Sequence, residues 1–187
     1  MGNVPLLHAD DSVLLIVDMQ TRLAGSMPAA DWARARDGAI VLIRAATAIG
    51  LPILVTRQYP KGLGETDPDI EAALPAHAER LDKTCFSACG AAGFLEVLEM
   101  TGRSHIVVCG METHVCVLQT VADLAARDHR PCVVGDAVCS RDPAHTANAL
   151  ERMRAGGIPV TNRESAMFEW LRDARHEQFK TVSKLLK

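Results

Sequence analysis

The chain has 187 residues, 48% of them hydrophobic, and its 20 basic and 23 acidic side chains give a formal net charge of -3. This length and composition predict one domain, residues 1–187, with a sizeable core. The charges are spread along the chain, which excludes a basic stripe for nucleic acid or an anionic membrane surface. No apolar stretch approaches the roughly 20 residues that span a bilayer, and the N-terminal segment has no basic region. We therefore expect a cytoplasmic protein that acts on a small molecule.

Apolar runs alternate with helical patterns along the chain, which predicts βαβ units and a parallel sheet. The apolar runs lie at residues 13–17, 53–55, 106–109, 132–134 and 158–160. Helices are predicted at residues 31–49, 94–100, 113–128 and 143–155, and in the tail from Glu164 onward. The connection at residues 57–81 is rich in Pro and Gly, so we expect a long loop there.

Three chemically capable side chains lie near the ends of predicted strands, where ligands bind in a doubly wound sheet. Asp18 directly follows the first apolar run, and Cys116 lies at a strand-to-helix junction whose free N–H groups would favour a thiolate. Lys83 lies in a short segment of apolar and β-favouring residues. Taken singly, Asp18 could be a turn residue, Lys83 a solvated charge and Cys116 a core thiol. Together they could converge on one edge of the sheet.

A Cys–His enzyme and a metal site are both disfavoured by the spacing of the residues. His114 and Cys116 are two positions apart, so in a helix their side chains point to different faces. The six cysteines show no Cys-x-x-Cys or paired Cys/His spacing. In a chain without a secretion signal, they are expected to be reduced thiols. We expect no metal and no cofactor.

Three strings of the sequence match one enzyme superfamily. They are LLIVDMQ at residues 14–20, KTCFSA at residues 83–88 and GMETHVCV at residues 110–117. In this ordered Asp, Lys, Cys set the chain resembles the isochorismatase-like cysteine hydrolases over nearly its whole length. The loop QYPKGLG at residues 58–64 is similar to that of isochorismatase-domain proteins of unassigned substrate. The resemblance implies a Rossmann-like, three-layer α/β/α fold with a parallel six-stranded sheet, and homo-oligomers of two or more subunits.

The resemblance also implies a role for each of these residues. Cys116 would be the nucleophile, Asp18 the general base, and Lys83 the cation that keeps the carboxylate and the thiolate charged. The backbone N–H groups of Glu112 and Cys116 would hold the oxyanion, and the Met111–Glu112 peptide bond would be cis. A free cysteine has a pKa of roughly 8.5, so we expect the ammonium and the helix start to raise the thiolate fraction at neutral pH.

The sequence differs from two related branches of the superfamily, the nicotinamidases and the true isochorismatases, and these differences argue against both activities. The nicotinamidase branch has an Asp-x-His metal motif after its second strand, whereas residues 55–59 read VTRQY. Zinc binding and nicotinamide hydrolysis are therefore not expected. True isochorismatases lack the cysteine because hydrolysis of a vinyl ether needs a proton donor, so Cys116 argues against that activity.

The first hypothesis is a metal-independent cysteine hydrolase that cleaves a C–N bond through a covalent intermediate on Cys116. The candidates for substrate contact are Gln58, Tyr59, Phe86 and Thr113, each of which could equally be a loop or core residue. The alternative is a catalytically idle member of the family that acts as an oligomeric scaffold or as a thiol redox sensor. The sequence does not specify the physiological substrate.

Overall fold

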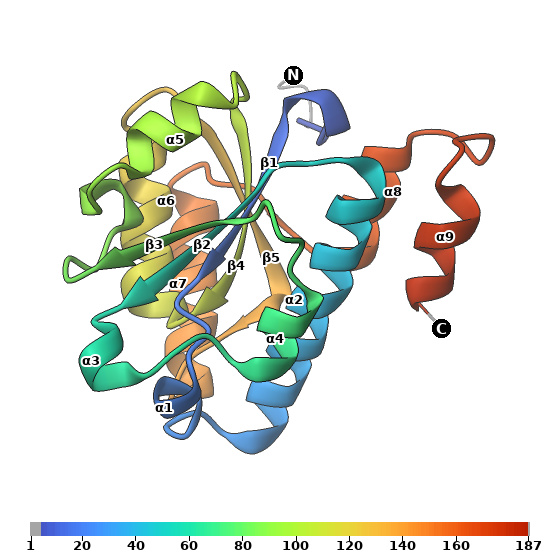
Figure 1. Ribbon diagram of the computed structural model, residues 1–187. Coiled ribbons are helices and arrows are strands. Elements are labelled where there is room, and N and C mark those ends of the chain that lie inside the picture. Colours follow the sequence, from blue (N-terminus) through green and yellow to red (C-terminus); the bar gives the residue numbers. More distant parts are fainter. Residues whose placement is uncertain (1–4, 187) are drawn as a thin grey trace.

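A computed structural model describes residues 5–186, and its centre is a six-stranded sheet in the order β3-β2-β1-β4-β5-β6 (Figure 1). The strands are β1 (Ser12–Val17), β2 (Ile53–Gln58), β3 (Glu79–Lys83), β4 (His105–Met111), β5 (Arg130–Cys139) and β6 (Val160–Thr161). All neighbouring strands pair in parallel. This strand order reverses direction between β1 and β4, as in a Rossmann-like sheet, so the predicted fold class is confirmed.

Helices cover both faces of the sheet, which gives three layers (Figure 1). One face carries α2 (Ala29–Ile49), α4 (Pro68–Ala73), α8 (Arg163–Leu171) and α9 (Phe179–Ser183). The other face carries α5 (Phe94–Met100), α6 (Leu118–Ala125) and α7 (Pro143–Ala155). Two short helices, α1 (Thr21–Ala24) and α3 (Pro60–Leu63), follow the ends of β1 and β2. Within residues 5–186, no helix is long and apolar enough to cross a bilayer.

The central strands β1 and β4 are buried on both faces because each face packs against helices. In β1, Leu14 and Ile16 belong to the core under α2 and α8. The alternate residues Val13, Leu15 and Val17 belong to the core under α5, α6 and α7. Successive strand side chains point to opposite faces, so one uninterrupted apolar run supplies both cores.

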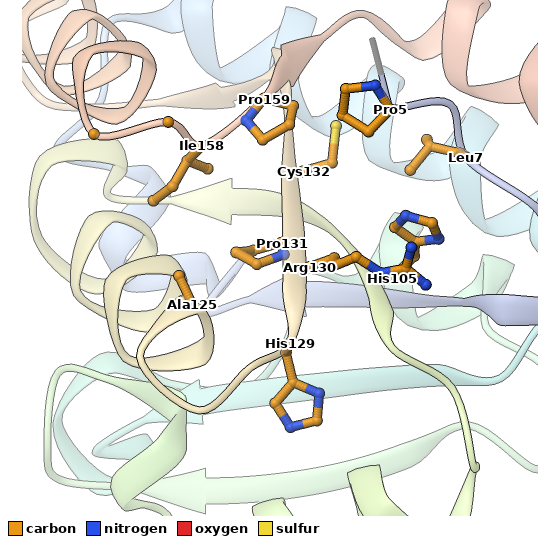
Figure 2. A pocket seen from close by; sticks show the side chains of 12 residues that line it. Pro5, Leu7, His105, Ala125, His129, Arg130, Pro131, Cys132, Ile158 and Pro159 are labelled. Atoms are coloured by element: carbon orange, nitrogen blue, oxygen red, sulfur yellow. The ribbon is translucent and has the colours of Figure 1, made fainter. Parts of the chain in front are cut away.

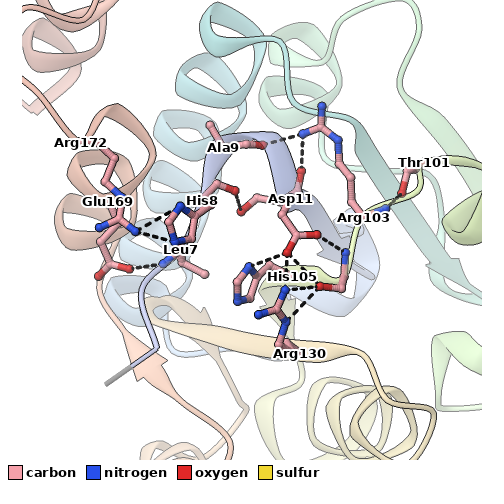
Figure 3. Close-up of polar contacts among 12 residues, drawn as sticks. Leu7, His8, Ala9, Asp11, Thr101, Arg103, His105, Arg130, Glu169 and Arg172 are labelled. Carbon is pink, nitrogen blue, oxygen red and sulfur yellow. Dashed lines mark hydrogen bonds and ion pairs between the residues drawn. The ribbon is translucent and has the colours of Figure 1, made fainter. Parts of the chain in front are cut away.

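Polar contacts connect the amino ends of the inner strands β1, β4 and β5 (Figure 3). The Asp11 carboxylate accepts hydrogen bonds from the N–H of Ser104 at 2.7 Å and from its hydroxyl at 2.9 Å. The same carboxylate contacts Arg130, the first residue of β5, and lies 3.3 Å from Nδ1 of His105, the first residue of β4. These contacts tie together the amino ends of β1, β4 and β5. The pairing of β4 with β5 shifts between Val108 and Gly110, so these contacts do not set the register at the carboxyl ends.

Four of the five predicted helical segments form where the sequence places them, including α5 at residues 94–100. The helix α2 ends at Gly50, whose φ of 84° suits a left-handed helix cap. The helix α7 follows Asp142, whose carboxylate accepts from the N–H of Ala144 at 2.8 Å. The tail forms α8 and α9, whose Trp170 and Val182 are buried in the core under α2.

One prediction from the sequence is wrong, and another is confirmed in position but not in the type of helix. The long loop expected at residues 57–81 contains α3, α4 and the start of β3. The edge strand β3 has the polar sequence ERLDK, so no apolar run announced it. The helix expected at residues 113–128 begins instead with a π-helical turn, Thr113–Val117, and becomes α-helical only at Leu118.

The backbones of β1 and β4 approach closely at Gly110, which pairs with Val17. A Cβ on Gly110 would lie 2.1 Å from the Val17 carbonyl oxygen, and the φ of Gly110 is 122°. Only glycine avoids both problems. Val17 directly precedes Asp18, and Gly110 directly precedes Met111. The close contact therefore sets the distance between the chain segments that begin at Asp18 and at Met111.

We expect Gly110→Ala to lower the free energy of unfolding by at least about 3 kcal/mol, because backbone strain of roughly 1–3 kcal/mol adds to the clash. Gly102→Ala is the matched control, since Gly102 has a φ of 64° and no described atom within 4 Å of an added Cβ. The control should lose only about 1 kcal/mol. Urea unfolding measures both variants, and equal losses would show that the close contact does not constrain the fold.

Candidate active site

The first component of the site is Asp18, which lies directly beyond the carboxyl end of β1. Its φ of 52° is left-handed, a conformation that Asp tolerates better than most residues. The Asp18 N–H donates to the Thr56 carbonyl oxygen at 3.1 Å, and its carbonyl oxygen accepts from the Gln20 N–H at 2.8 Å. The chain therefore turns sharply at Asp18, and its side chain is buried at the point where the strand order reverses.

Lys83, the last residue of β3, forms an ion pair with Asp18. Its Nζ lies 2.6 Å from Asp18 Oδ2, and both side chains are fully buried. The ammonium also donates to Gln58 Oε1 at 2.6 Å and to the Phe86 carbonyl oxygen at 2.9 Å. The second carboxylate oxygen, Oδ1, accepts from the Thr56 hydroxyl at 2.8 Å. A buried ion pair persists only with such further hydrogen bonds, because each ion has lost its hydration.

Burial raises the pKa of the Asp18 carboxyl above its usual value, although the charge of Lys83 and hydrogen bonds from Lys83, Thr56 and Cys116 act in the opposite direction. A carboxylate with a raised pKa binds a proton more tightly than a free Asp does. The surroundings of Asp18 therefore suit a group that takes up a proton and later returns it.

Cys116 lies in the π-helical turn after β4, with 5% of its surface exposed. Burial, followed by the negative charge of Asp18, raises the pKa of its thiol to about 12, while the charge of Lys83 acts in the opposite direction. The expectation that Lys83 and the helix start raise the thiolate fraction of Cys116 at neutral pH is therefore wrong for the free protein. The ammonium is engaged by Asp18, so Cys116 is a neutral thiol beside a carboxylate at neutral pH.

The turn between β4 and the π-helix contains the residues expected to hold an oxyanion. The Met111–Glu112 peptide bond is cis, as the resemblance implies. The Glu112 carbonyl oxygen accepts from the N–H groups of Val115 and Val117, at 3.1 and 3.2 Å. In an α-helix that bond would come from the intervening residue, Cys116. The π-helical turn thus directs the bonds of this carbonyl to the two neighbours of the cysteine.

A cavity of about 420 Å³ opens above Cys116. Its lining residues are Leu23, Gln58, Leu63, Phe86, Glu112, His114, Val115, Cys116 and Arg141. Of the four candidates for substrate contact, Gln58 and Phe86 line this cavity. Tyr59 lines a different hollow, beside Pro60 and Thr84, and the Thr113 side chain is fully buried beneath the turn.

The sequence analysis did not assign several polar residues of the site, although one of them, Gln20, ends the matching string at residues 14–20. Thr56 lies inside an apolar strand, yet its hydroxyl holds Asp18. The Gln20 amide donates to the Gln58 carbonyl oxygen at 3.0 Å and accepts from its N–H at 2.7 Å. Arg141 lies just beyond β5 and pairs with Glu112 across the cavity wall. The partners in these contacts are 29 or 38 positions apart, so local spacing could not identify them.

His114 is not a partner of the cysteine. Its Nδ1 lies 3.0 Å from the Ser140 hydroxyl, and its ring lies 4.7 Å from that of His145. Burial lowers the pKa of His114, and the charge of Glu112 opposes this shift. The structure therefore agrees with the expectation that His114 and Cys116 do not pair.

A second cavity, of about 240 Å³, lies at the opposite edge of the sheet, at the amino ends of β4 and β5 (Figure 2). It contains His105, His129 and Cys132, but none of the described residues that line it carries a carboxylate. Burial raises the pKa of Cys132 to about 12. The described wall of this cavity thus offers imidazoles but no buried carboxylate–ammonium pair like that of Asp18 and Lys83, which favours the first cavity as the reactive one. In residues 5–186, no cluster of three or more His, Cys, Asp or Glu side chains could hold a metal ion.

Comparison with known proteins identifies the family. The model of the isochorismatase domain matches residues 12–165. Isochorismatase domain-containing protein 2A of Mus musculus is 35% identical over 181 residues, which are 95% of this chain and 84% of the mouse protein. A structure described as MAR1 ribonuclease from Caenorhabditis elegans has a TM-score of 0.91 and 32% identity, covering 97% of this chain and 92% of that one.

A more distant match shares the fold. The Escherichia coli YcaC protein, described as an octameric hydrolase of unknown specificity, has a TM-score of 0.90 and 21% identity, covering 100% of this chain and 91% of that one. This chain thus combines a doubly wound sheet, a buried Asp18–Lys83 pair where the strand order reverses, and a match to the isochorismatase domain model. The chain belongs to the isochorismatase domain family.

Alkylation of Cys116 by iodoacetamide should accelerate about tenfold per pH unit from pH 7 to pH 10. A pKa of about 12 keeps the thiol protonated throughout this range, so the reactive thiolate increases with every unit. Mass spectrometry of the peptide that contains Cys116 measures the rate. In the urea-denatured chain the curve should flatten above roughly pH 9, where an unperturbed thiol has ionised. A rate independent of pH in the folded protein would mean that the sulfur has already lost its proton.

Proposed function

We propose that this protein is a metal-independent cysteine hydrolase that cleaves an amide-like C–N bond of a small molecule. The observation that carries the proposal is the fully buried Asp18–Lys83 pair, whose charges act on the Cys116 thiol at the floor of a cavity. Burying an ion pair costs desolvation free energy, so a buried pair often marks a functional site. Here the pair places a proton acceptor, Asp18, beside the thiol of Cys116.

In the first half of the reaction, Cys116 Sγ attacks the carbonyl carbon of the bound amide while its proton moves to the Asp18 carboxylate. The carbon becomes tetrahedral and its oxygen takes the negative charge. When the C–N bond breaks, Asp18 returns the proton to the departing nitrogen, so the amine or ammonia leaves neutral. The acyl group remains on Cys116 as a thioester.

In the second half, water replaces the amine. The Asp18 carboxylate accepts a proton from the water as its oxygen attacks the thioester carbon, and the proton then returns to the sulfur as the C–S bond breaks. The products are a carboxylic acid and the free thiol. Lys83 stays protonated throughout, and its positive charge favours the thiolate and the oxyanion near it.

The backbone N–H groups of Glu112 and Cys116 are proposed as the oxyanion donors. The turn that contains them supports this role, because the Glu112 carbonyl oxygen accepts from Val115 and Val117 and not from Cys116, its usual α-helical donor. Gln58 holds Lys83 from the cavity side, and Phe86 forms part of the wall. We propose these two for substrate contact, whereas Tyr59 lines a different hollow and the Thr113 side chain is fully buried.

Two alternatives find less support. A thiol sensor needs an accessible thiol with a low pKa, and Cys116 is buried with a raised one. A phosphodiester substrate, as the name of the C. elegans protein would suggest, needs free cations, whereas Arg141 at this cavity is paired with Glu112. A single domain over residues 1–187, a cytoplasmic location and homo-oligomers remain part of the proposal, and the octameric E. coli protein supports the last of these.

Cys116→Ala should abolish ammonia release from a library of small amides and the acyl adduct seen by intact-protein mass spectrometry. Asp18→Asn should lower kcat by about 10²–10⁴, because the thiol loses its base. Cys89→Ala is the control, since Cys89 is also buried, with 8% exposed against 5% for Cys116, and should keep full activity. Turnover that survives in Cys116→Ala would overturn the proposal.

A further inference from the structure

The walls of the cavity above Cys116 contain one charged pair and otherwise apolar or neutral groups. Glu112 and Arg141 are the formally charged residues among the described lining residues. Beneath them, the charges of Asp18 and Lys83 neutralise each other at 2.6 Å. The net charge that a substrate meets is therefore close to zero.

Glu112 and Arg141 are bound to each other on several sides. The Arg141 backbone N–H donates to Glu112 Oε2 at 2.9 Å. Its guanidinium donates through Nε at 3.0 and 3.1 Å and through Nη2 at 2.6 Å. Burial would raise the pKa of Glu112, but the bonds from Arg141 outweigh it and lower that pKa, while Glu112 raises the pKa of Arg141. Both groups stay ionised, and their opposite charges compensate each other.

The neutral part of the wall adds to this selectivity. His114 shares a hydrogen bond with Ser140, and burial lowers its pKa, so its ring is neutral at pH 7. The other lining residues are Cys116, the neutral Gln58 and four apolar residues: Leu23, Leu63, Phe86 and Val115. A cavity of about 420 Å³ lies toward the small end of ligand sites, which run from roughly 300 to 1,000 Å³.

We propose that the substrates are uncharged carboxamides with a compact apolar acyl group, and that the Glu112–Arg141 pair excludes acids and amines of the same size. This inference rests on the proposed hydrolase function for the choice of an amide. A charged ligand would lose hydration on entry and find no free counter-charge. An apolar group would replace water against the four apolar side chains.

The charge selectivity can be measured at Cys116 without turnover. Three methanethiosulfonates of similar size serve as probes: the neutral 2-hydroxyethyl, the anionic 2-sulfonatoethyl and the cationic 2-(trimethylammonio)ethyl compound. Each transfers its thioalkyl group to the sulfur and releases methanesulfinate. Labelling of the Cys116 peptide at pH 9 is followed by mass spectrometry, and each rate is divided by that of the same probe with N-acetylcysteine.

In the unmodified protein the normalised rate of the neutral probe should exceed those of both ionic probes at least tenfold. Glu112→Gln should free the guanidinium and raise the normalised rate of the anionic probe about tenfold. Arg141→Gln should free the carboxylate and raise that of the cationic probe instead. Either ionic probe reacting as fast as the neutral one in the unmodified protein would overturn the inference, whether or not the variants fold.

Turnover separates this inference from the function on which it rests. Butyramide and succinamate have chains of equal length, but succinamate ends in a carboxylate. Hydrolysis of butyramide at least tenfold faster supports the inference. Equal kcat/KM for the two would overturn the neutral substrate class and leave the hydrolase intact. Absence of any amide turnover or acyl adduct would instead sink the hydrolase, and the probe rates would still report the charge selectivity of the cavity.

Discussion

A carboxylate and an ammonium, both fully buried and 2.6 Å apart, place the strictest demand on this structure. Neither ion can be sheltered from water unless every remaining hydrogen-bonding position is filled. Three strands together fill these positions, since β1 ends at Asp18, β2 supplies Thr56 and Gln58, and β3 ends at Lys83. The close approach of the backbone at Gly110 then places the segment that contains Cys116 against the same pair.

The Asp18–Lys83 pair makes this site different from one in which the cysteine is already a thiolate before substrate binds. Because Asp18 already uses the charge of Lys83, burial keeps the Cys116 thiol protonated in the free protein. In the proposed reaction, loss of the proton is coupled to attack on a substrate, so the thiol stays inert toward oxidants between turnovers. The same balance extends to the cavity wall, where Glu112 and Arg141 neutralise each other. Because the Asp18–Lys83 pair and the Glu112–Arg141 pair each have no net charge, the site favours a neutral ligand.

The sequence predicted the parts of the fold that depend on local patterns. Apolar runs located β1, β2, β4 and β5, and capping residues located α2 and α7. The edge strand β3 escaped because its residues are polar, and α3 and α4 escaped because prolines and glycines in residues 57–81 read as loop. The three candidate catalytic residues were found from motifs, whereas Thr56 and Arg141 could not be found. A threonine in an apolar strand and an arginine after a strand are ordinary until the chain folds and gives them partners.

A double-mutant cycle between Asp18→Asn and Lys83→Met tests the central claim most directly, with the free energy of unfolding measured in urea at pH 7. Each single substitution leaves a buried charge unpaired and should cost about 3–5 kcal/mol. The double variant removes both charges and should cost less than either single one, giving a coupling energy above about 3 kcal/mol. Additive losses would contradict the claim, because they would mean that the two side chains do not depend on each other.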